Sequence, residues 1–365
     1  MKSVYIHIPF CKTICTYCDF CKMFYYPNMV DKYLCCLKKE VEEYYKGEVV
    51  KTLYIGGGTP SCLSVDELKK LFDIVGVFKL SPDVEFTIEC NVETLTEEKI
   101  ELFCKNGVNR ISLGVQSMLP KNITFLGRHH VKENVEKTVK LLREYGLNNI
   151  NLDLIYALPK QAIKDLQYDL DEYTKLNIPH ISTYSLMIEP TTKLYLNNIQ
   201  PIDENIDRNM YDYICNYLKD KGYKHYEISN FCLSDSESKH NLTYWNNEEY
   251  YGFGVGASGY IDGIRYDNTK SITSYIDGVT KYEEDNIDKE KQIEYEFILG
   301  LRKTAGISKI DFKKKYNLEI CDIIIVKDLI EKGYLIDDGK YIYIKEEYLY
   351  TSNLILVNFL GGNYE

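Results

Sequence analysis

The sequence predicts an α/β fold in which a partial, TIM-like (β/α)6 barrel is followed by a β extension and a small C-terminal winged-helix-like domain. Six short, β-rich runs alternate with longer helical stretches, which indicates a parallel sheet with helical crossovers. A glycine-rich segment comes next, and a helical tail with two further strands ends the chain. We expect these three parts at residues 1–222, 223–280 and 281–365.

The expected strands of the barrel recur at the spacing of strand and helix repeats. They are 3–8, 51–55, 85–90, 110–115, 151–155 and 181–186. Helix starts support the pattern, because Ser64 and Glu67 have the spacing of a capping box and Thr96 precedes two glutamates that suit a helix N-terminus. Right-handed crossovers curl such repeats into a partial or complete barrel.

The C-terminal third departs from this alternation. The strand-like 223–228 and the glycine-rich 251–260 predict an antiparallel extension that widens or covers the barrel, and the charged stretch 281–291 is expected to be a linker. The tail has the order of a winged helix, with helices at 294–302, 309–316 and 322–332 and strands at 333–336 and 340–344. Because the last of these helices is not basic, we expect it to pack or to contact a partner rather than read DNA.

Composition and charge exclude several classes of function. The 365 residues include 44 Lys and Arg against 55 Asp and Glu, and the net charge of -11 repels nucleic acids and anionic membranes. No apolar run approaches the roughly 18 residues of a transmembrane segment, and the N-terminus lacks a signal-peptide pattern, so we expect a cytoplasmic protein. The 12 cysteines are too sparse for a disulfide framework, so their spacing matters more than their number.

Three cysteines lie within eight residues, directly after the first expected strand. Cys11, Cys15 and Cys18 have the spacing C-x3-C-x2-C, which is typical of a metal site. Three thiolates can hold three irons of a [4Fe-4S] cluster and leave the fourth iron open to another ligand. The alternative is a zinc site that Cys21 completes, since four thiolates make a closed tetrahedral site.

The cysteine motif and the segments around it carry a resemblance that spans nearly the whole chain. C-x3-C-x2-C after a first strand is the signature of radical S-adenosylmethionine (SAM) proteins. The chain resembles the oxygen-independent coproporphyrinogen III oxidase superfamily of these proteins through 5–11, 55–60, 87–91, 109–117, 126–130 and 226–230. The resemblance implies a radical SAM barrel, a [4Fe-4S] cluster on the three cysteines, and SAM as a second cofactor.

The resemblance also assigns a SAM pocket, for which the sequence offers suitable chemistry. Glycines allow the backbone to approach a ligand, an arginine can pair with its carboxylate, and an aspartate in an apolar strand requires a partner such as the ribose diol. A plain tight turn and mutual ion pairs are the structural alternatives. The residues assigned to SAM are Tyr5, Tyr17, Gly57, Gly58, Thr59, Glu89, Gln116, Arg128 and Asp153.

Two features make the chain similar to the heme-chaperone branch of this superfamily. Few residues precede Cys11, whereas the oxidases carry a long substrate-binding segment there, and residues 240–245 match the H-N-x-x-Y-W heme motif of that branch. The resemblance implies that the chain binds heme with His240 as an axial ligand, and we expect this histidine on a polar loop beside Tyr244 and Trp245.

The function implied is a heme chaperone that delivers heme to acceptor proteins, membrane-bound respiratory proteins among them. We expect a monomer or dimer without nucleic-acid partners and without coproporphyrinogen oxidase activity. The alternatives are an oxygen-independent coproporphyrinogen III oxidase or another radical SAM enzyme acting on porphyrins, and a zinc-bound interaction protein.

Overall fold

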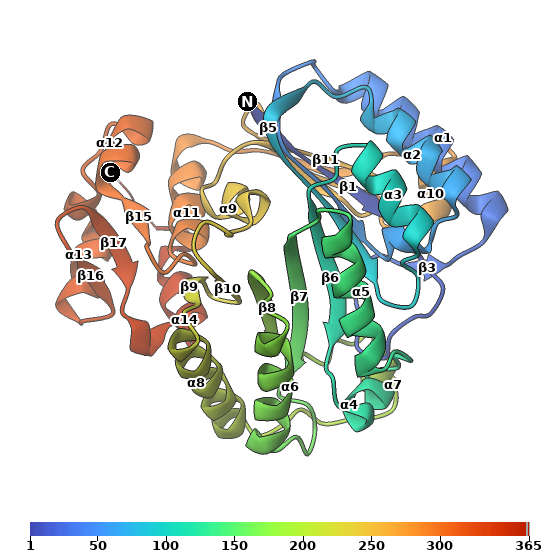
Figure 1. The fold of residues 1–365 in the computed structure, drawn as a ribbon. Helices are drawn as coiled ribbons and strands as arrows, with labels where there is room; N and C mark the ends of the chain where they lie inside the picture. The colour runs from blue at the N-terminus through green and yellow to red at the C-terminus, as the bar shows by residue number, and fades with distance from the viewer. Residues whose placement is uncertain (363, 365) are drawn as a thin grey trace.

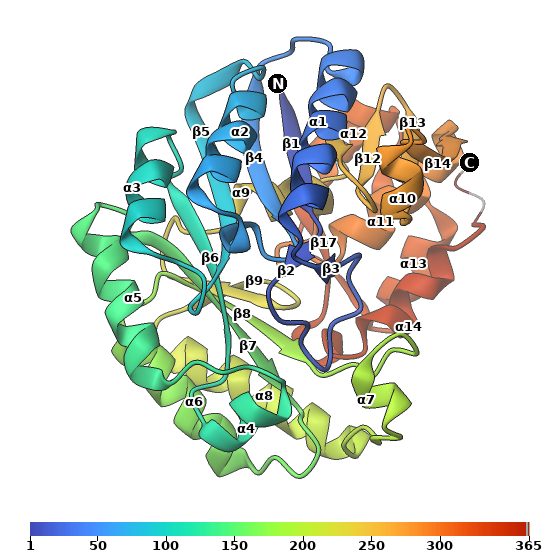
Figure 2. The ribbon, with the colours of Figure 1, turned by 90° about the vertical axis from the view of Figure 1, so that its right-hand side faces the viewer.

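The computed structural model describes residues 1–362 and 364 and contains the predicted partial barrel. Six parallel strands lie side by side at the centre of a 12-stranded sheet whose order is β14-β13-β12-β11-β1-β4-β5-β6-β7-β8-β10-β9. The sheet is strongly curved (Figures 1 and 2), and its two edge strands do not pair with each other within the described residues. The six strands are β1 (Lys2–Ile8), β4 (Val50–Gly57), β5 (Leu80–Asn91), β6 (Arg110–Gln116), β7 (Asn149–Tyr156) and β8 (His180–Ser185).

Helices cover the outer face of the parallel strands, as the alternating pattern predicts. The capping box at Ser64 is present, whereas the Thr96 side chain makes no capping hydrogen bond within the described chain although its helix begins there. These helices are α1 (Pro27–Tyr44), α2 (Val65–Val75), α3 (Glu97–Lys105), α5 (Lys132–Glu144), α6 (Ile163–Lys175) and α8 (Glu204–Asp220). The shorter α4 (Pro120–Phe125) and α7 (Lys193–Leu196) lie at the carboxyl end of the strands (Figure 1), where α7 contacts the cysteine loop. The short strands β2 (Phe10–Cys11) and β3 (Met23–Phe24) pair beside the 3-10 helix η1 (Pro60–Cys62).

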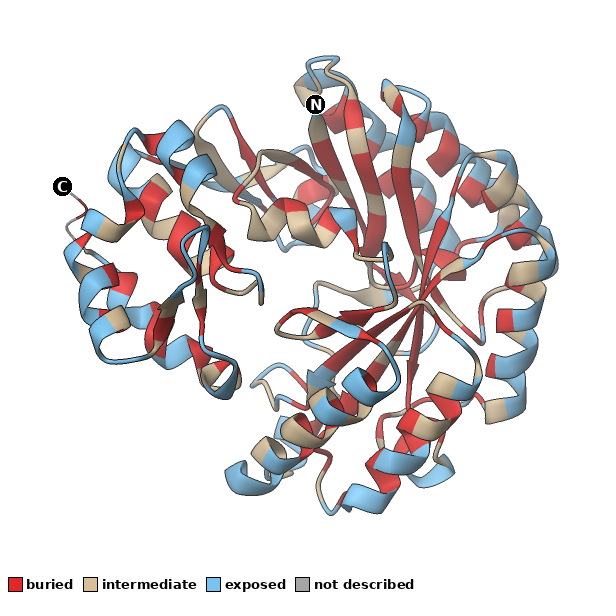
Figure 3. Ribbon diagram, turned by 60° about the vertical axis from the view of Figure 1, so that its left-hand side comes forward, coloured by how far each residue is buried: buried red, intermediate tan, exposed pale blue. Residues whose placement is uncertain are grey.

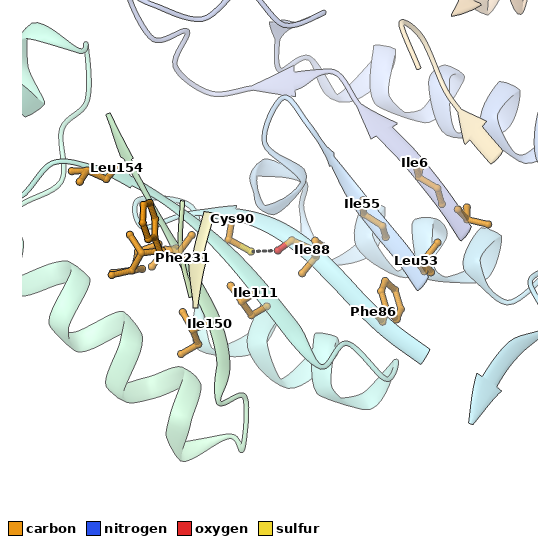
Figure 4. Packing of buried hydrophobic residues seen from close by; sticks show 14 of the residues in the cluster. Ile6, Leu53, Ile55, Phe86, Ile88, Cys90, Ile111, Ile150, Leu154 and Phe231 are labelled. Atoms are coloured by element: carbon orange, nitrogen blue, oxygen red, sulfur yellow. Dashed lines mark hydrogen bonds between the residues drawn. The ribbon is translucent and has the colours of Figure 1, made fainter. Parts of the chain in front are cut away.

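The main core lies between the parallel strands and these helices. Strand β6 is buried along its whole length, because helices cover its outer face and its other face lies inside the barrel. Figure 3 shows the buried strands inside a shell of half-exposed helices, and Figure 4 shows apolar side chains of neighbouring strands packed together, among them Ile55, Ile88 and Ile111. The fold class predicted from the sequence is confirmed.

The β extension adds strands to both edges of the barrel. At one edge β10 (Asn230–Cys232) and β9 (Lys224–Glu227) continue the sheet antiparallel to β8. At the other edge β11 (Tyr250–Phe253) runs parallel to β1, and β12 (Ser258–Ile261), β13 (Ile264–Asn268) and β14 (Lys281–Asn286) continue antiparallel. The short helix α10 (Ile272–Ile276) connects β13 to β14.

The prediction of a linker at 281–291 is wrong, because the first half of this stretch is strand β14 and the second half begins helix α11. The strand pairs with β13 through its backbone, while most of its charged side chains are exposed. Charges of this kind protect the free edge of a sheet from pairing with other molecules. The division of the chain at 222 and 280 stays a prediction.

The C-terminal part has the element order of a winged helix. Helices α11 (Lys289–Gly300), α12 (Lys309–Tyr316) and α13 (Ile324–Glu331) surround a three-stranded sheet of β15 (Ile307–Ser308), β17 (Tyr341–Ile344) and β16 (Leu335–Asp337). It ends with α14 (Ser352–Leu356), and its 3-10 helices are η2 (Ile320–Asp322), η3 (Glu346–Tyr348) and η4 (Val357–Phe359). Across the described residues, no helix has both the length and the apolar character needed to span a membrane.

Helix α9 (Lys239–Trp245) occupies the amino-terminal end of the barrel, between the sheet and the C-terminal part (Figure 1). The Glu85 carboxylate on β5 accepts hydrogen bonds from the backbone N–H groups of Lys239 at 3.0 Å and His240 at 2.9 Å. The hydroxyls of Thr243 and Ser3 lie 2.9 Å apart, which ties the helix to the start of β1. The prediction of a polar loop around His240 is therefore wrong. The segment forms a helix instead, because the first backbone N–H groups of α9 donate to acceptors inside the barrel.

Replacing Glu85 with alanine is expected to lower the free energy of unfolding by about 1–3 kcal/mol, because two buried N–H groups lose their acceptor. Urea denaturation measures the change. Glu43→Ala is the matched control, since Glu43 is exposed on α1, and it should leave the stability nearly unchanged. Equal stabilities of the Glu85→Ala protein and the parent would refute this role of Glu85.

Candidate functional site

A cavity of about 340 Å³ lies at the carboxyl ends of the parallel strands, where the loops of a barrel gather. The cysteine loop, the ends of β4 to β8 and the loop after β8 line it. The predicted ligand residues that line it are Cys11, Cys15, Cys18, Tyr17, Gly57, Gly58, Thr59, Glu89, Gln116, Arg128 and Asp153. The structure thus brings together all predicted site residues except Tyr5 and His240.

The three cysteines share one short loop and face the same cavity. The Cys11 thiol lies 3.5 Å from the Thr59 hydroxyl, and the Arg128 guanidinium lies 3.9 Å from the Cys15 sulfur. Burial raises the pKa of Cys11, and it raises the pKa of Cys18 to about 11. Metal binding at this loop must therefore release protons, because thiolates are the ligands.

Cys21, the fourth thiol that the zinc alternative requires, is not among the residues that line the cavity with the other three cysteines. Sulfur ligands of one tetrahedral zinc lie about 3.8 Å apart, given Zn–S bonds of about 2.3 Å. Within residues 1–362 and 364, no group of three or more His, Cys, Asp or Glu side chains has a geometry that would hold a single metal ion. The Cys21 thiol instead points to the Lys270 carbonyl at 3.5 Å. The three thiols that face the cavity match the number of irons that a radical SAM cluster binds through cysteine.

The glycine turn after β4 is required by close packing. A Cβ at Gly57 would lie 2.4 Å from the His7 ring, one at Gly58 would lie 2.8 Å from the Ile8 carbonyl oxygen, and Gly57 has a φ of +109°. The turn also aims the Gly57 N–H at a Glu89 carboxylate oxygen, 2.9 Å away. The structural explanation of these glycines therefore holds, and the turn also orients a carboxylate of the cavity.

Two half-buried carboxyl groups provide acceptors inside the cavity. Burial raises the pKa of Glu89 to about 7, although the Tyr54 hydroxyl donates to it at 2.7 Å. Burial also raises the pKa of Asp153 to about 6, and the Asn151 amide donates to it at 2.8 Å. Carboxylates in this setting can accept hydrogen bonds from an ammonium group or a ribose diol.

Arg128 is already paired within the protein. Its guanidinium contacts the Glu93 carboxylate at 3.1 Å, the Gly114 carbonyl at 2.7 Å and the Asn91 side-chain oxygen at 3.0 Å. The sequence analysis did not identify Glu93, although this carboxylate follows β5 by two residues. Recognition of the SAM carboxylate by Arg128 stays a prediction.

Gln116 and Arg110 each have a buried polar side-chain atom without a hydrogen-bond partner among the described residues. The Gln116 side-chain oxygen is buried without a hydrogen-bond partner in the described part of the chain, and its backbone is held at a φ of 72°. Arg110 lines the cavity and is 2% exposed, and its Nε atom has no partner among the described residues. Buried polar atoms of this kind require a ligand or water. Sequence reasoning missed Arg110, which lies in the matched segment 109–117.

Tyr5 and His240 lie below the cavity rather than on its surface. The Tyr5 hydroxyl is 3.0 Å from the His7 Nδ1 atom, and its ring stacks on Tyr54. The His240 ring is held at both nitrogens, with Nδ1 2.8 Å from the Thr52 hydroxyl and Nε2 2.8 Å from the Tyr244 hydroxyl. Burial lowers the pKa of His240 to about 3, so the imidazole is neutral.

Comparisons with known proteins identify the family and the relatives of this chain. Residues 5–172 match the radical SAM superfamily. The chain is 41% identical to the heme chaperone HemW of Bacillus subtilis over 99% of this chain and 100% of the relative, and 33% identical to HemW of Escherichia coli over 98% of both. In fold it is similar to the coproporphyrinogen III oxidase HemN of Escherichia coli, with a TM-score of 0.86 and 22% identity over 98% of this chain and 89% of that one.

The superfamily match implies a [4Fe-4S] cluster and SAM. The donor chemistry of the cavity fits both groups, because it combines three thiols on one loop with half-buried carboxylates and the unpartnered oxygen of Gln116. When bound, the cluster would supply redox chemistry beside SAM. The protein's own contribution is to hold the thiols on one loop and to keep polar acceptors away from bulk water.

Replacing Cys11, Cys15 or Cys18 singly with alanine is expected to abolish the brown absorbance of the anaerobically reconstituted protein, since each thiolate binds a separate iron. The matched control is Cys21→Ala, which should retain the absorbance because its thiol points to the Lys270 carbonyl. Iron and sulfide analysis provides a second measurement. A complete cluster in all three variants would refute the assignment of the cluster to these cysteines.

The affinity for SAM is expected to rise about tenfold between about pH 6 and pH 8, because ionised carboxylates accept hydrogen bonds more strongly than neutral ones. The pKa of Glu89 is about 7 and that of Asp153 is about 6, so both acceptors weaken as the pH falls through these values. Calorimetry at constant cluster content measures the effect. Asp153→Asn should flatten the lower part of the profile, and an affinity independent of pH in the parent would exclude this role of the carboxylates.

Proposed function

This chain belongs to the HemW family of the radical SAM superfamily, and we propose that it is a heme chaperone that binds heme and delivers it to acceptor proteins. The observation that carries the proposal is the full-length match to the relatives named heme chaperone, which includes the segment with the H-N-x-x-Y-W motif at 240–245. Membrane-bound respiratory proteins that require heme are the acceptors we propose.

His240 supplies the axial ligand in this proposal. Its imidazole is neutral, as iron ligation requires, because burial lowers its pKa to about 3. The ring is only 1% exposed and both nitrogens are hydrogen-bonded, so heme can reach it only when α9 moves outward. One partner, Tyr244, lies on α9 itself, and a rotation of that tyrosine would free the Nε2 atom.

The outer side of α9 offers contacts suited to the rest of the heme. Trp245 is half-buried, and the Arg302 guanidinium lies 5.5 Å from its ring centre. The Lys303 ammonium donates to the Asn246 side chain at 2.6 Å. Heme combines a flat apolar macrocycle with two propionates, so an aromatic ring beside two cations suits it. Both side chains are cationic at this position, although the chain as a whole has a net charge of -11.

His240→Ala is expected to weaken heme binding by at least about tenfold and to abolish transfer to a heme-free globin, because the axial ligand is lost. The heme absorbance spectrum and the globin spectrum measure binding and transfer. His129→Ala is the control, because His129 is exposed and should leave both unchanged.

The parent and variant proteins also test the alternative that the chain is a coproporphyrinogen III oxidase. Each protein, with its cluster reconstituted, is incubated anaerobically with reductant, SAM and coproporphyrinogen III. Efficient formation of protoporphyrinogen IX, together with parent-like heme transfer by the His240→Ala protein, would overturn the chaperone proposal.

A further inference from the structure

Tyr54 lies between the Glu89 carboxylate of the cavity and His240, and the cavity also reaches Asn241 of the same H-N-x-x-Y-W motif. The Tyr54 ring lies 5.0 Å from the His240 ring, centre to centre, with an interplanar angle of 27°. Its hydroxyl donates to the Glu89 carboxylate at 2.7 Å, and the residue lines the cavity. One side chain on β4 therefore contacts both the residue assigned to SAM and the residue assigned to heme.

The contacts of Tyr54 restrict the movement of its ring. The Glu89 carboxylate is held at both oxygens, by the Tyr54 hydroxyl on one and by the Gly57 N–H on the other. The Tyr54 ring also stacks on Tyr5, with centres 6.1 Å apart. A shift of the ring would therefore change the position of the carboxylate, and a fixed carboxylate restrains the ring.

We propose that Tyr54 couples the two sites, so that SAM and heme oppose each other's binding. This inference rests on the proposed function. When His240 leaves the barrel to bind heme iron, Tyr54 loses its stacking partner and Glu89 loses a fixed donor, so the SAM site loosens. When SAM engages Glu89, Tyr54 is held in place and His240 keeps the surface on which it packs.

The coupling is reciprocal, because binding free energies at two sites change each other by the same factor. SAM then acts as a release effector, since it favours the state in which His240 is inside the barrel. A chaperone requires such a step, because tight binding of heme opposes its delivery. The chain needs no cleavage of SAM for this step.

A double-mutant cycle on heme-free protein tests Tyr54 independently of heme. SAM affinity is measured by calorimetry for the cluster-loaded parent, Tyr54→Phe, His240→Ala and the double variant. Tyr54→Phe keeps the ring and removes only the hydroxyl that reaches Glu89. We expect His240→Ala to weaken SAM binding about fivefold in the parent background and to have little effect in the Tyr54→Phe background.

Tyr173→Phe is the matched control, because it removes the hydroxyl of another buried tyrosine, one on α6 that donates to the Asp153 carbonyl and has no contact with Glu89. His240→Ala should retain its effect on SAM in this background. Equal effects of His240→Ala in the parent and the Tyr54→Phe protein would overturn the role of Tyr54.

A second experiment uses heme itself. The single tryptophan, Trp245, lies on α9, so its fluorescence reports heme arrival beside the helix. SAM is expected to lower heme affinity about fivefold in the parent and to have little effect in Tyr54→Phe. Heme binding that is unaffected by SAM in the parent overturns the coupling and leaves the chaperone proposal intact. A parent that does not bind heme refutes the chaperone proposal, and the heme-free cycle still decides the role of Tyr54.

Discussion

Burial sets the electrostatics of the barrel interior, and one buried cation, Arg110, acts on four of the groups that burial perturbs. Arg110 lies at the start of β6, and its positive charge lowers the pKa values of Glu89 and Asp153, which burial raises. The same charge lowers the pKa values of His180 and His240 further below their usual range. Without it, the two carboxyl groups would hold their protons more tightly and both histidines would be easier to charge. Arg110 thus partly offsets burial at the two carboxyl groups, whereas it reinforces burial at the two imidazoles.

Polar side chains in the interior also explain why α9 can enter the barrel. An apolar interior would leave the first N–H groups of a seven-residue helix without acceptors, whereas Glu85 provides two. Thr52 and Ser3 provide further partners at the starts of neighbouring strands. The helix is held by hydrogen bonds more than by a large apolar face, and segments of this kind open more easily than core helices.

The fold and the cavity could be predicted from local patterns, but the surroundings of His240 could not. Strand periodicity and the cysteine spacing are local, so they identify the barrel and the cluster loop without knowledge of distant contacts. The position of α9 depends on Glu85, which is 155 residues away from His240 in the sequence. A polar stretch such as 234–241 looks like a loop when its partners lie far along the chain. The pairing of Arg128 with Glu93 was missed for the same reason.

The architecture separates two tasks along the axis of one barrel. The carboxyl ends of the strands gather the cysteine loop and the acceptors that we predict for SAM, whereas the amino ends hold the helix that carries the H-N-x-x-Y-W motif. Two ligands at one end would compete for the same space, and two ligands on separate domains would require a hinge to influence each other. A single layer of aromatic side chains between the two ends avoids both problems, because Tyr54 touches Glu89 on one side and His240 on the other. One tyrosine on β4 thus contacts both the cavity carboxylate Glu89 and the imidazole of α9, which is the physical connection that the proposed coupling of SAM and heme requires.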